Sequence, residues 1–247
     1  MPSKSRLYLD HPLSSGQIVP LSPDEANYLF AVMRLQAGTL ISVFNGRDGE
    51  WDGAVHPQGK RGGHVEIVAQ TGPQLSPPDL WLLFAPIKKA RTDFIVEKAT
   101  ELGVAKIQPV LTDYTNGERF NVDKQIAHAR EAAEQCGGTY IPEVTAPVKL
   151  AALLKDWDSS RPLWFCDETL LGQGNTHLSN VTKGAVLIGP EGGFSPAERD
   201  LLRSLPFATP IALGPRILRA ETAAVAALTL WQATHGDWDG VARPAAT

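Results

Sequence analysis

Two glycine-bearing loops constrain the fold of this chain more than any other feature of its sequence. The first loop, residues 189–194, follows a short apolar run, and so does the second, residues 214–219. Each loop precedes a helical pattern, and loops that join strand ends to helices form the ligand crevice of an open α/β sheet. One such loop would be an ordinary connection, but two loops only a short helix apart predict a ligand site.

The chemistry of the first loop does not suit a phosphate. It contains no Lys or Arg, it lacks the Gly-Lys-Ser/Thr ending of a phosphate-binding loop, and the carboxylate of Glu191 lies at its centre. Gly189, Gly192 and Gly193 can adopt positive φ angles and let the backbone approach a ligand closely. Pro190 stiffens the turn between them. The loop therefore favours a small polar ligand that is neutral or positively charged.

Helix-start signals follow both loops. Residues 195–198 form a capping box with proline at the first helical position. Gly214 and Pro215 interrupt the second apolar run, and an Ala-rich helix is expected over residues 221–232. Glu221 would then lie in the first turn, where the helix dipole favours a carboxylate.

Composition limits the class of protein. A chain of 247 residues with 43% hydrophobic residues can build one large domain or two smaller ones. No apolar run approaches the roughly 20 residues of a membrane span, and the first residues lack the apolar stretch of a signal peptide. Cys136 and Cys166 are expected to be reduced core thiols of a cytoplasmic protein, and the histidine spacing predicts no metal site.

The net charge of −4 argues against an extended nucleic-acid-binding surface, which would be basic. The residues before Asp79 contain 6 Lys and Arg against 7 Asp and Glu, and the remainder contains 17 against 20. Any RNA contact must therefore be a local patch. The candidate patches are Lys88, Lys89 and Arg91; Arg216 and Arg219; and Lys60 and Arg61, of which the last pair is expected to be ordinary solvated surface.

A stretch rich in Gly and Pro, residues 71–78, divides two differently patterned regions. The first region predicts a small β-barrel over residues 1–72. Its expected strands are 6–9, 40–44, 50–55 and 64–68, and its one helix runs from a capping box at 22–25 to about Leu35.

Strands and helices alternate in the second region, residues 79–247, which predicts a mainly parallel α/β sheet covered on both faces. The expected strands are 80–85, 107–111, 163–166, 185–188 and 210–213. The expected helices are 93–102, 123–135, 148–157, one from Pro196, and 221–232.

The chain resembles the SPOUT methyltransferases, which bind S-adenosylmethionine in a deep trefoil knot, and within them the bacterial 16S ribosomal RNA uridine-N3 methyltransferases. The resemblance covers nearly the whole chain. It rests on Ile188–Ser195, Leu213–Gly214 and Ile217–Ala223, and further upstream on Val32–Arg34, Phe44–Gly46, Glu97–Val104 and Glu131–Gly137. It implies a SPOUT-type trefoil-knotted parallel sheet with helices on both faces in residues 79–247, and a PUA-like, RNA-binding β-barrel in residues 1–72.

The resemblance also implies a function. It implies an enzyme that uses S-adenosylmethionine to methylate N3 of a specific uridine in 16S ribosomal RNA of the small ribosomal subunit. It further implies a cytoplasmic homodimer, with free 16S rRNA or the assembled small subunit as its partner. The implied cofactor-binding residues are Ile188, Gly189, Pro190, Glu191, Gly192, Gly193, Leu213, Gly214, Ile217, Leu218, Arg219, Thr222 and Ala223.

Methylation of uracil N3 needs a group that accepts its proton and a charge that stabilises the ring oxygens. Arg219 is the candidate for the charge, because a guanidinium stays protonated. Glu191 is the candidate for proton acceptor or for a cofactor-orienting group, and Glu221 is expected to be structural. The identity of the base stays open at this point.

Two departures from the family pattern remove positive charge. Members often carry a basic residue where this chain has Gly138, and another in the segment of Asp113 and Tyr114, so RNA contacts are not assigned there. The alternatives are another SPOUT RNA methyltransferase, acting on a tRNA base or a ribose 2′-OH, and a catalytically inactive RNA-binding protein.

Two C-terminal segments follow the second glycine loop. The final helix, with Leu228, Leu230 and Trp231, is expected either to form the dimer interface or to pack on its own sheet. Residues 236–247 carry no motif.

Overall fold

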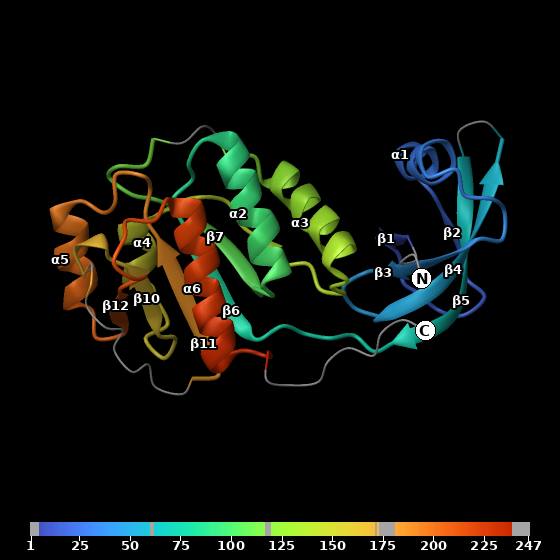
Figure 1. Ribbon diagram of the computed structural model, residues 1–247. Helices are drawn as coiled ribbons and strands as arrows, with labels where there is room; N and C mark the ends of the chain where they lie inside the picture. Colours follow the sequence, from blue (N-terminus) through green and yellow to red (C-terminus); the bar gives the residue numbers. More distant parts are fainter. Residues whose placement is uncertain (1–4, 60–61, 117–119, 171, 173–180, 239–247) are drawn as a thin grey trace. The chain divides into compact units, whose positions relative to one another are not determined.

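The computed structural model describes residues 5–59, 62–116, 120–170, 172 and 181–238, and these form two compact units (Figure 1). The first unit contains the residues up to Ser76 together with Ala133–Tyr140, and the second contains the others. The last turn of helix α3 (Val122–Cys136) and the residues after it therefore belong to the first unit, although they follow 56 residues of the second (Pro77–Ala132). The predicted domain limits, 1–72 and 79–247, remain a prediction.

The first unit is built on a five-stranded sheet in the order β1-β3-β4-β5-β2. Its strands are β1 Arg6–Tyr8, β2 Ile18–Pro20, β3 Leu40–Phe44, β4 Glu50–Gln58 and β5 Gly62–Gly72. All neighbours are antiparallel except β1 and β3. Apolar residues alternate along the strands to form the core, as Val65 and Ile67 do in β5. Strand β2 was not predicted, because three residues are too few to show a period.

The helix expected from the capping box at Ser22 to about Leu35 begins as predicted and ends differently. Helix α1, Pro23–Ala26, has both hydrogen bonds of the box, but the backbone then continues as a π-helix, Asn27–Val32. Arg34 adopts a φ of 55°, in the left-handed region that non-glycine residues rarely occupy, and this ends the helix. The apolar pattern could not distinguish a π-helix from an α-helix.

The second unit contains a seven-stranded sheet in which every pair is parallel, in the order β12-β10-β11-β6-β7-β8, with β9 paired to β7. Its strands are β6 Asp79–Phe84, β7 Lys106–Leu111, β8 Glu143–Val144, β9 Val148–Lys149, β10 Leu163–Cys166, β11 Lys183–Ile188 and β12 Ala208–Ile211. The helices after β6 are α2 Lys89–Glu101, α3 Val122–Cys136, α4 Leu150–Lys155, α5 Pro196–Ser204 and α6 Ala220–His235, with a 3₁₀ turn at Glu168–Leu170.

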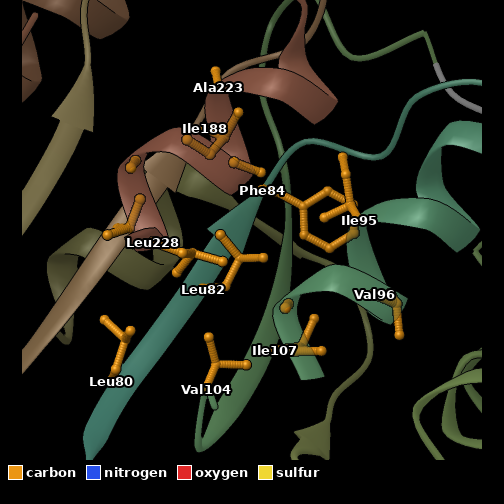
Figure 2. Close-up of a cluster of buried hydrophobic side chains, with 14 of the residues drawn as sticks. Leu80, Leu82, Phe84, Ile95, Val96, Val104, Ile107, Ile188, Ala223 and Leu228 are labelled. Atoms are coloured by element: carbon orange, nitrogen blue, oxygen red, sulfur yellow. The ribbon is translucent and has the colours of Figure 1, made fainter. Parts of the chain in front are cut away.

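Both faces of this sheet are covered, as predicted. Leu80, Leu82 and Phe84 of β6 point to one face, where the side chains of α2 and α6 pack against them (Figure 2). Leu83 points to the other face and packs in a cluster with α4 and α5. This apolar contact on both sides is what a parallel sheet with crossover helices requires.

Several predicted elements are corrected by the structure. The helix expected over 148–157 is the two-residue strand β9 followed by the shorter α4. The strand expected over 210–213 is β12, two residues earlier, because its register with β10 pairs Leu163 with Ala208 and Cys166 with Ile211. Strands β8 and β9 have two residues each, too few for any periodicity to reveal.

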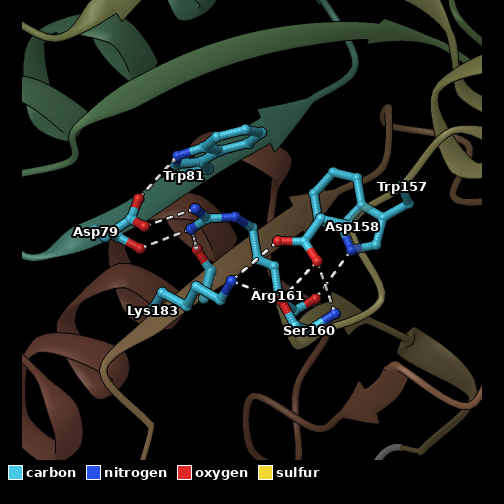
Figure 3. A network of polar contacts seen from close by, with 8 residues as sticks. Asp79, Trp81, Trp157, Asp158, Ser160, Arg161 and Lys183 are labelled. Atoms are coloured by element: carbon cyan, nitrogen blue, oxygen red, sulfur yellow. Dashed lines mark hydrogen bonds and ion pairs between the residues drawn. The ribbon is translucent and has the colours of Figure 1, made fainter.

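A buried arginine stabilises the sheet at the amino ends of its central strands (Figure 3). Arg161 is 6% exposed and donates hydrogen bonds to the Asp79 carboxylate at 2.6 Å and to the backbone oxygens of Asp79 and Gly184. Its guanidinium carbon lies 4.1 Å from the centre of the Trp81 ring. This network lies at the opposite strand ends from the two glycine loops.

The expectation that both cysteines are core thiols is wrong for Cys136, which is exposed at the end of α3. In α6, Leu228 and Trp231 are buried against their own sheet, whereas Leu230 is 38% exposed. The packing interpretation therefore holds for Leu228 and Trp231. None of the helices in the described ranges combines the length and apolar character needed to span a bilayer.

Candidate functional site

A cavity of about 360 Å³ opens at the carboxyl ends of β10, β11 and β12. Twelve of the thirteen predicted cofactor-binding residues line it, among the residues that the structure describes. They are Ile188, Gly189, Pro190, Glu191, Gly192, Gly193, Leu213, Gly214, Ile217, Leu218, Arg219 and Ala223. Thr222 lies outside this lining, on the exposed side of α6. The structure therefore brings the two loops together around one space.

A third segment, which the sequence interpretation missed, completes the cavity wall. Cys166, the last residue of β10, also lines the cavity, as do Asp167 and Glu168, which follow it. The sequence could have predicted this segment, because β10 was a predicted strand and ligands bind beyond the carboxyl ends of parallel strands. Its polar end was overlooked because it contains no glycine.

Asp167 and Cys166 differ in their protonation. Burial raises the pKa of the Asp167 carboxyl, but hydrogen bonds from Thr169 and Arg203 outweigh that effect and hold the pKa below its usual range. Burial, with the nearby carboxylate of Glu168, raises the pKa of the Cys166 thiol to about 12. The thiol therefore stays protonated at neutral pH and is no nucleophile.

Gly193 is favoured by its backbone conformation and lies close to the carboxylate of Glu168. It adopts a φ of 69°, and a Cβ there would overlap the carboxylate of Glu168, which also pairs with Arg199 of α5 at 3.0 Å. Gly192 has no positive φ, and a Cβ there would lie 3.5 Å from Tyr114. Of the three glycines in the first loop, Gly193 alone adopts the left-handed conformation.

The segment around Asp113, where a basic residue was lacking, is bonded to the start of α5. The backbone N–H of Asp113 donates to Glu198 Oε1 at 2.9 Å, and the Ser195 hydroxyl lies 2.5 Å from Asp113 Oδ2. Glu198 also completes the predicted capping box with Ser195. This arrangement holds Tyr114, which is 49% exposed, against the first loop at Gly192.

Glu191 and Glu221 are placed near the same cation. Arg91 of α2 lies 3.5 Å from an oxygen of each. Glu221 is in the first turn of α6, as predicted, but it is also one partner of this pair of ion contacts.

Arg219 is the N-cap residue of α6, exposed and part of the cavity lining. Within the described residues, no hydrogen bond or ion pair occupies its guanidinium. Arg219 and Glu191 therefore border the same space, with the arginine able to turn toward a bound group.

Of the predicted basic patches, Lys88 and Lys89 are exposed at the start of α2, and Arg216 is exposed in the second loop. Lys60 and Arg61 lie outside the described residues, as do residues 239–247 of the tail.

The cavity suits a small molecule with an apolar ring system and charged groups. Ile188, Leu213 and Leu218 provide apolar wall, whereas Glu168 and Glu191 provide carboxylates and Arg216 and Arg219 provide guanidinium groups. Glycine backbone at the first loop leaves polar groups accessible without a side chain in the way. No cluster of three or more His, Cys, Asp or Glu side chains suited to a metal occurs in the part of the chain that the structure describes.

Comparisons with known proteins match both units to domains of RNA methyltransferases. The RNA methyltransferase domain family matches residues 74–232, and the RNA methyltransferase PUA domain family matches residues 21–68. A ribosomal RNA small subunit methyltransferase E from Rickettsia conorii is 29% identical over 229 residues, 91% of this chain and 93% of that protein. The protein of the same name from Synechocystis is 30% identical over 218 residues, 85% of this chain and 71% of that protein.

Two solved structures are similar over almost the whole chain. A putative methyltransferase from Legionella pneumophila, in complex with bound S-adenosylmethionine, has a TM-score of 0.83 and 29% identity, covering 95% of this chain and 99% of that one. A ribosomal RNA small subunit methyltransferase E from Neisseria gonorrhoeae, bound to S-adenosylmethionine, has a TM-score of 0.80 and 27% identity, covering 95% and 99%.

Proposed function

The chain belongs to the family of RNA methyltransferases whose curated members are named ribosomal RNA small subunit methyltransferase E, and on this premise we propose that it transfers a methyl group from S-adenosylmethionine to N3 of a specific uridine in 16S ribosomal RNA. The observation that carries the proposal is the single cavity lined by both glycine loops at the carboxyl ends of parallel strands. Its apolar wall and its carboxylates match an adenosyl group joined to a cationic sulfur.

The bound cofactor supplies an electrophilic methyl group on a sulfonium. Backbone of the first loop and apolar side chains such as Ile188 and Leu218 would hold it in the cavity. Arg219 turns its guanidinium toward the uracil, where it stabilises charge on a ring oxygen as the N3 proton leaves. Glu191, on the same cavity, accepts that proton directly or orients the cofactor. The cysteine in the wall takes no part, because its thiol stays protonated.

Residues 1–72 form the RNA-binding domain in this proposal, and residues 79–247 form the methyltransferase domain. The PUA family match over residues 21–68 supports the first assignment. The substrate is 16S rRNA, free or assembled in the small ribosomal subunit, and the enzyme works as a homodimer in the cytoplasm, where ribosomes are assembled.

The decisive experiment is nucleoside analysis by mass spectrometry. Free 16S rRNA and small subunits lacking the modification are each incubated with the protein and S-adenosylmethionine. N3-methyluridine at one position is expected, and the faster of the two substrates identifies the natural one. A methylated ribose, or methylation of tRNA alone, would favour another SPOUT activity. No methylation by a protein that binds the cofactor would favour an inactive RNA-binding protein.

Calorimetry separates the cofactor from other nucleotides. S-adenosylmethionine and S-adenosylhomocysteine are expected to bind, whereas ATP is repelled by the acidic first loop and meets no lysine there. Tight ATP binding without S-adenosylmethionine binding would reject the proposed function.

A further inference from the structure

Arg91 connects three parts of the chain that meet beside the cavity. Its Nη1 lies 3.5 Å from Glu191 of the first loop, and its Nε lies 3.5 Å from Glu221 of α6, which follows the second loop. Arg91 itself lies in the first turn of α2. Helix α2 begins beside the first loop because β6, which precedes it, pairs in parallel with β11, which precedes the loop.

The backbone at Arg91 is held firmly. The next residue, Thr92, is 5% exposed, and its hydroxyl both accepts from the Ile87 N–H and donates to the Ile87 carbonyl. Asp93 accepts hydrogen bonds from Lys124 and Gln125 of α3. The backbone that carries Arg91 is therefore fixed by these bonds, whereas Glu191 lies within the first loop and Glu221 lies in the first turn of α6, directly after the second loop.

Without Arg91, two carboxylates would be left close together. Both lie within ion-pair distance of one guanidinium, and like charges at such separations repel. The second oxygen of Glu221 is buried and has no hydrogen-bond partner among the described residues. Among the described residues, Arg91 is the one cation that forms an ion pair with Glu191, and it is also the one that pairs with Glu221.

We propose that Arg91 is a positioning residue, which holds the first loop and the start of α6 in the arrangement that binds S-adenosylmethionine. The inference rests on the proposed function and assigns Arg91 no contact with the reacting atoms. It also gives Glu221 a role in the site beyond that of a carboxylate at a helix N-terminus.

Positioning can be distinguished from a simple charge effect with two ligands. S-adenosylmethionine carries a positive sulfur, and S-adenosylhomocysteine does not. If Arg91 acted only through its charge, its removal would strengthen binding of the cationic ligand relative to the neutral one. If Arg91 positions the loops, both ligands lose affinity by the same factor.

The test is calorimetric titration of the full-length protein with both ligands. Arg91→Met is expected to raise both dissociation constants about tenfold, the scale of two partly exposed ion pairs. Arg91→Lys should recover part of this affinity, because one ammonium cannot reach both carboxylates as a planar fork does. Lys98→Met is the matched control, because Lys98 pairs with Glu97 and Glu101 on the same helix away from the cavity. It should leave both constants unchanged.

A double-mutant cycle with Glu221→Gln completes the test. Arg91→Met should cost less affinity in the Glu221→Gln background than in the wild type, because the contact with Glu221 is then already lost and only the contact with Glu191 remains to be removed. Unchanged affinity in Arg91→Met, selective tightening of S-adenosylmethionine, or an equal loss in Lys98→Met would each overturn the inference while leaving the proposed function intact. A wild-type protein that binds neither ligand would instead reject the proposed function itself.

Discussion

The carboxylate of Glu168 occupies the space that a Cβ at Gly193 would need. The two residues come from different sides of the cavity, one after β10 and one in the first glycine loop. A larger side chain at position 193 would therefore have to displace the Glu168 carboxylate and adopt a positive φ, in addition to blocking the approach of backbone to a ligand that its sequence context predicted.

Substitution of Gly193 should abolish cofactor binding. Gly193→Val combines the overlap with Glu168 and a side chain at a φ of 69°, where a β-branched residue is strained by about 1–3 kcal/mol. Calorimetry and thermal denaturation should show lost affinity with reduced stability. Gly192→Ala is the control for stability and should retain it, because its Cβ would have an ordinary contact with Tyr114.

A second substitution separates the two causes at Gly193. Gly193→Ala combined with Glu168→Ala removes the overlap and leaves only the backbone strain, so it should bind better than Gly193→Ala alone. Equal affinity of the single and double variants would mean that Glu168 does not matter here.

Arg219→Ala should reduce turnover far more than cofactor affinity. Loss of a donor that stabilises transition-state charge typically lowers the rate by about 10²–10³. Arg219→Lys should recover only part of the rate, because a lysine ammonium lacks the planar set of donors that an arginine guanidinium presents. Single-turnover methylation, measured beside calorimetric affinity, checks this split. Full activity of the alanine variant would exclude Arg219 from the mechanism.

Arg161→Ala should destabilise the second unit without changing the site. Arg161 is almost fully buried, and its removal takes a donor from the backbone oxygens of Asp79 and Gly184, a loss that typically costs about 1–3 kcal/mol for a buried acceptor. Chemical denaturation measures the loss. Asp79→Asn should also destabilise the unit, because it leaves the buried guanidinium of Arg161 without its carboxylate partner, although the bonds to the two backbone oxygens remain. A folded Arg161→Ala protein should bind S-adenosylmethionine normally, and altered affinity would show that the two ends of the sheet are coupled.

Stability should fall as the pH drops below about 6.5, because of His235. Burial beside the rings of Trp164 and Trp231 lowers the pKa of His235 below its ordinary 6.5. The unfolded chain therefore binds a proton more readily than the folded chain, so stability is full above pH 6.5 and declines through the pH range just below it. Thermal denaturation as a function of pH should show this decline, and His235→Phe should reduce it. An identical pH dependence in the variant would assign the effect to other groups.

Much of the fold followed from local pattern. The capping boxes at Ser22 and Ser195, the alternation of apolar strands with helices, and the glycine loops all depend on residues within a few positions of one another. The short strands β8 and β9 and the π-helix after Ala26 could not be predicted in this way. The strands depend on pairing with distant residues, and the π-helix has the same apolar pattern as an α-helix.

The sequence by itself determined which loops would form the candidate site, because glycine, proline and capping residues act locally on the backbone. Only the tertiary structure decided what completes the site. The Cys166–Glu168 segment, the overlap of Glu168 with Gly193, and the position of Arg91 between Glu191 and Glu221 all join residues far apart in the chain. They meet because parallel strands place their carboxyl ends at one edge of the sheet, and that strand order is set by long-range packing, which local pattern does not encode.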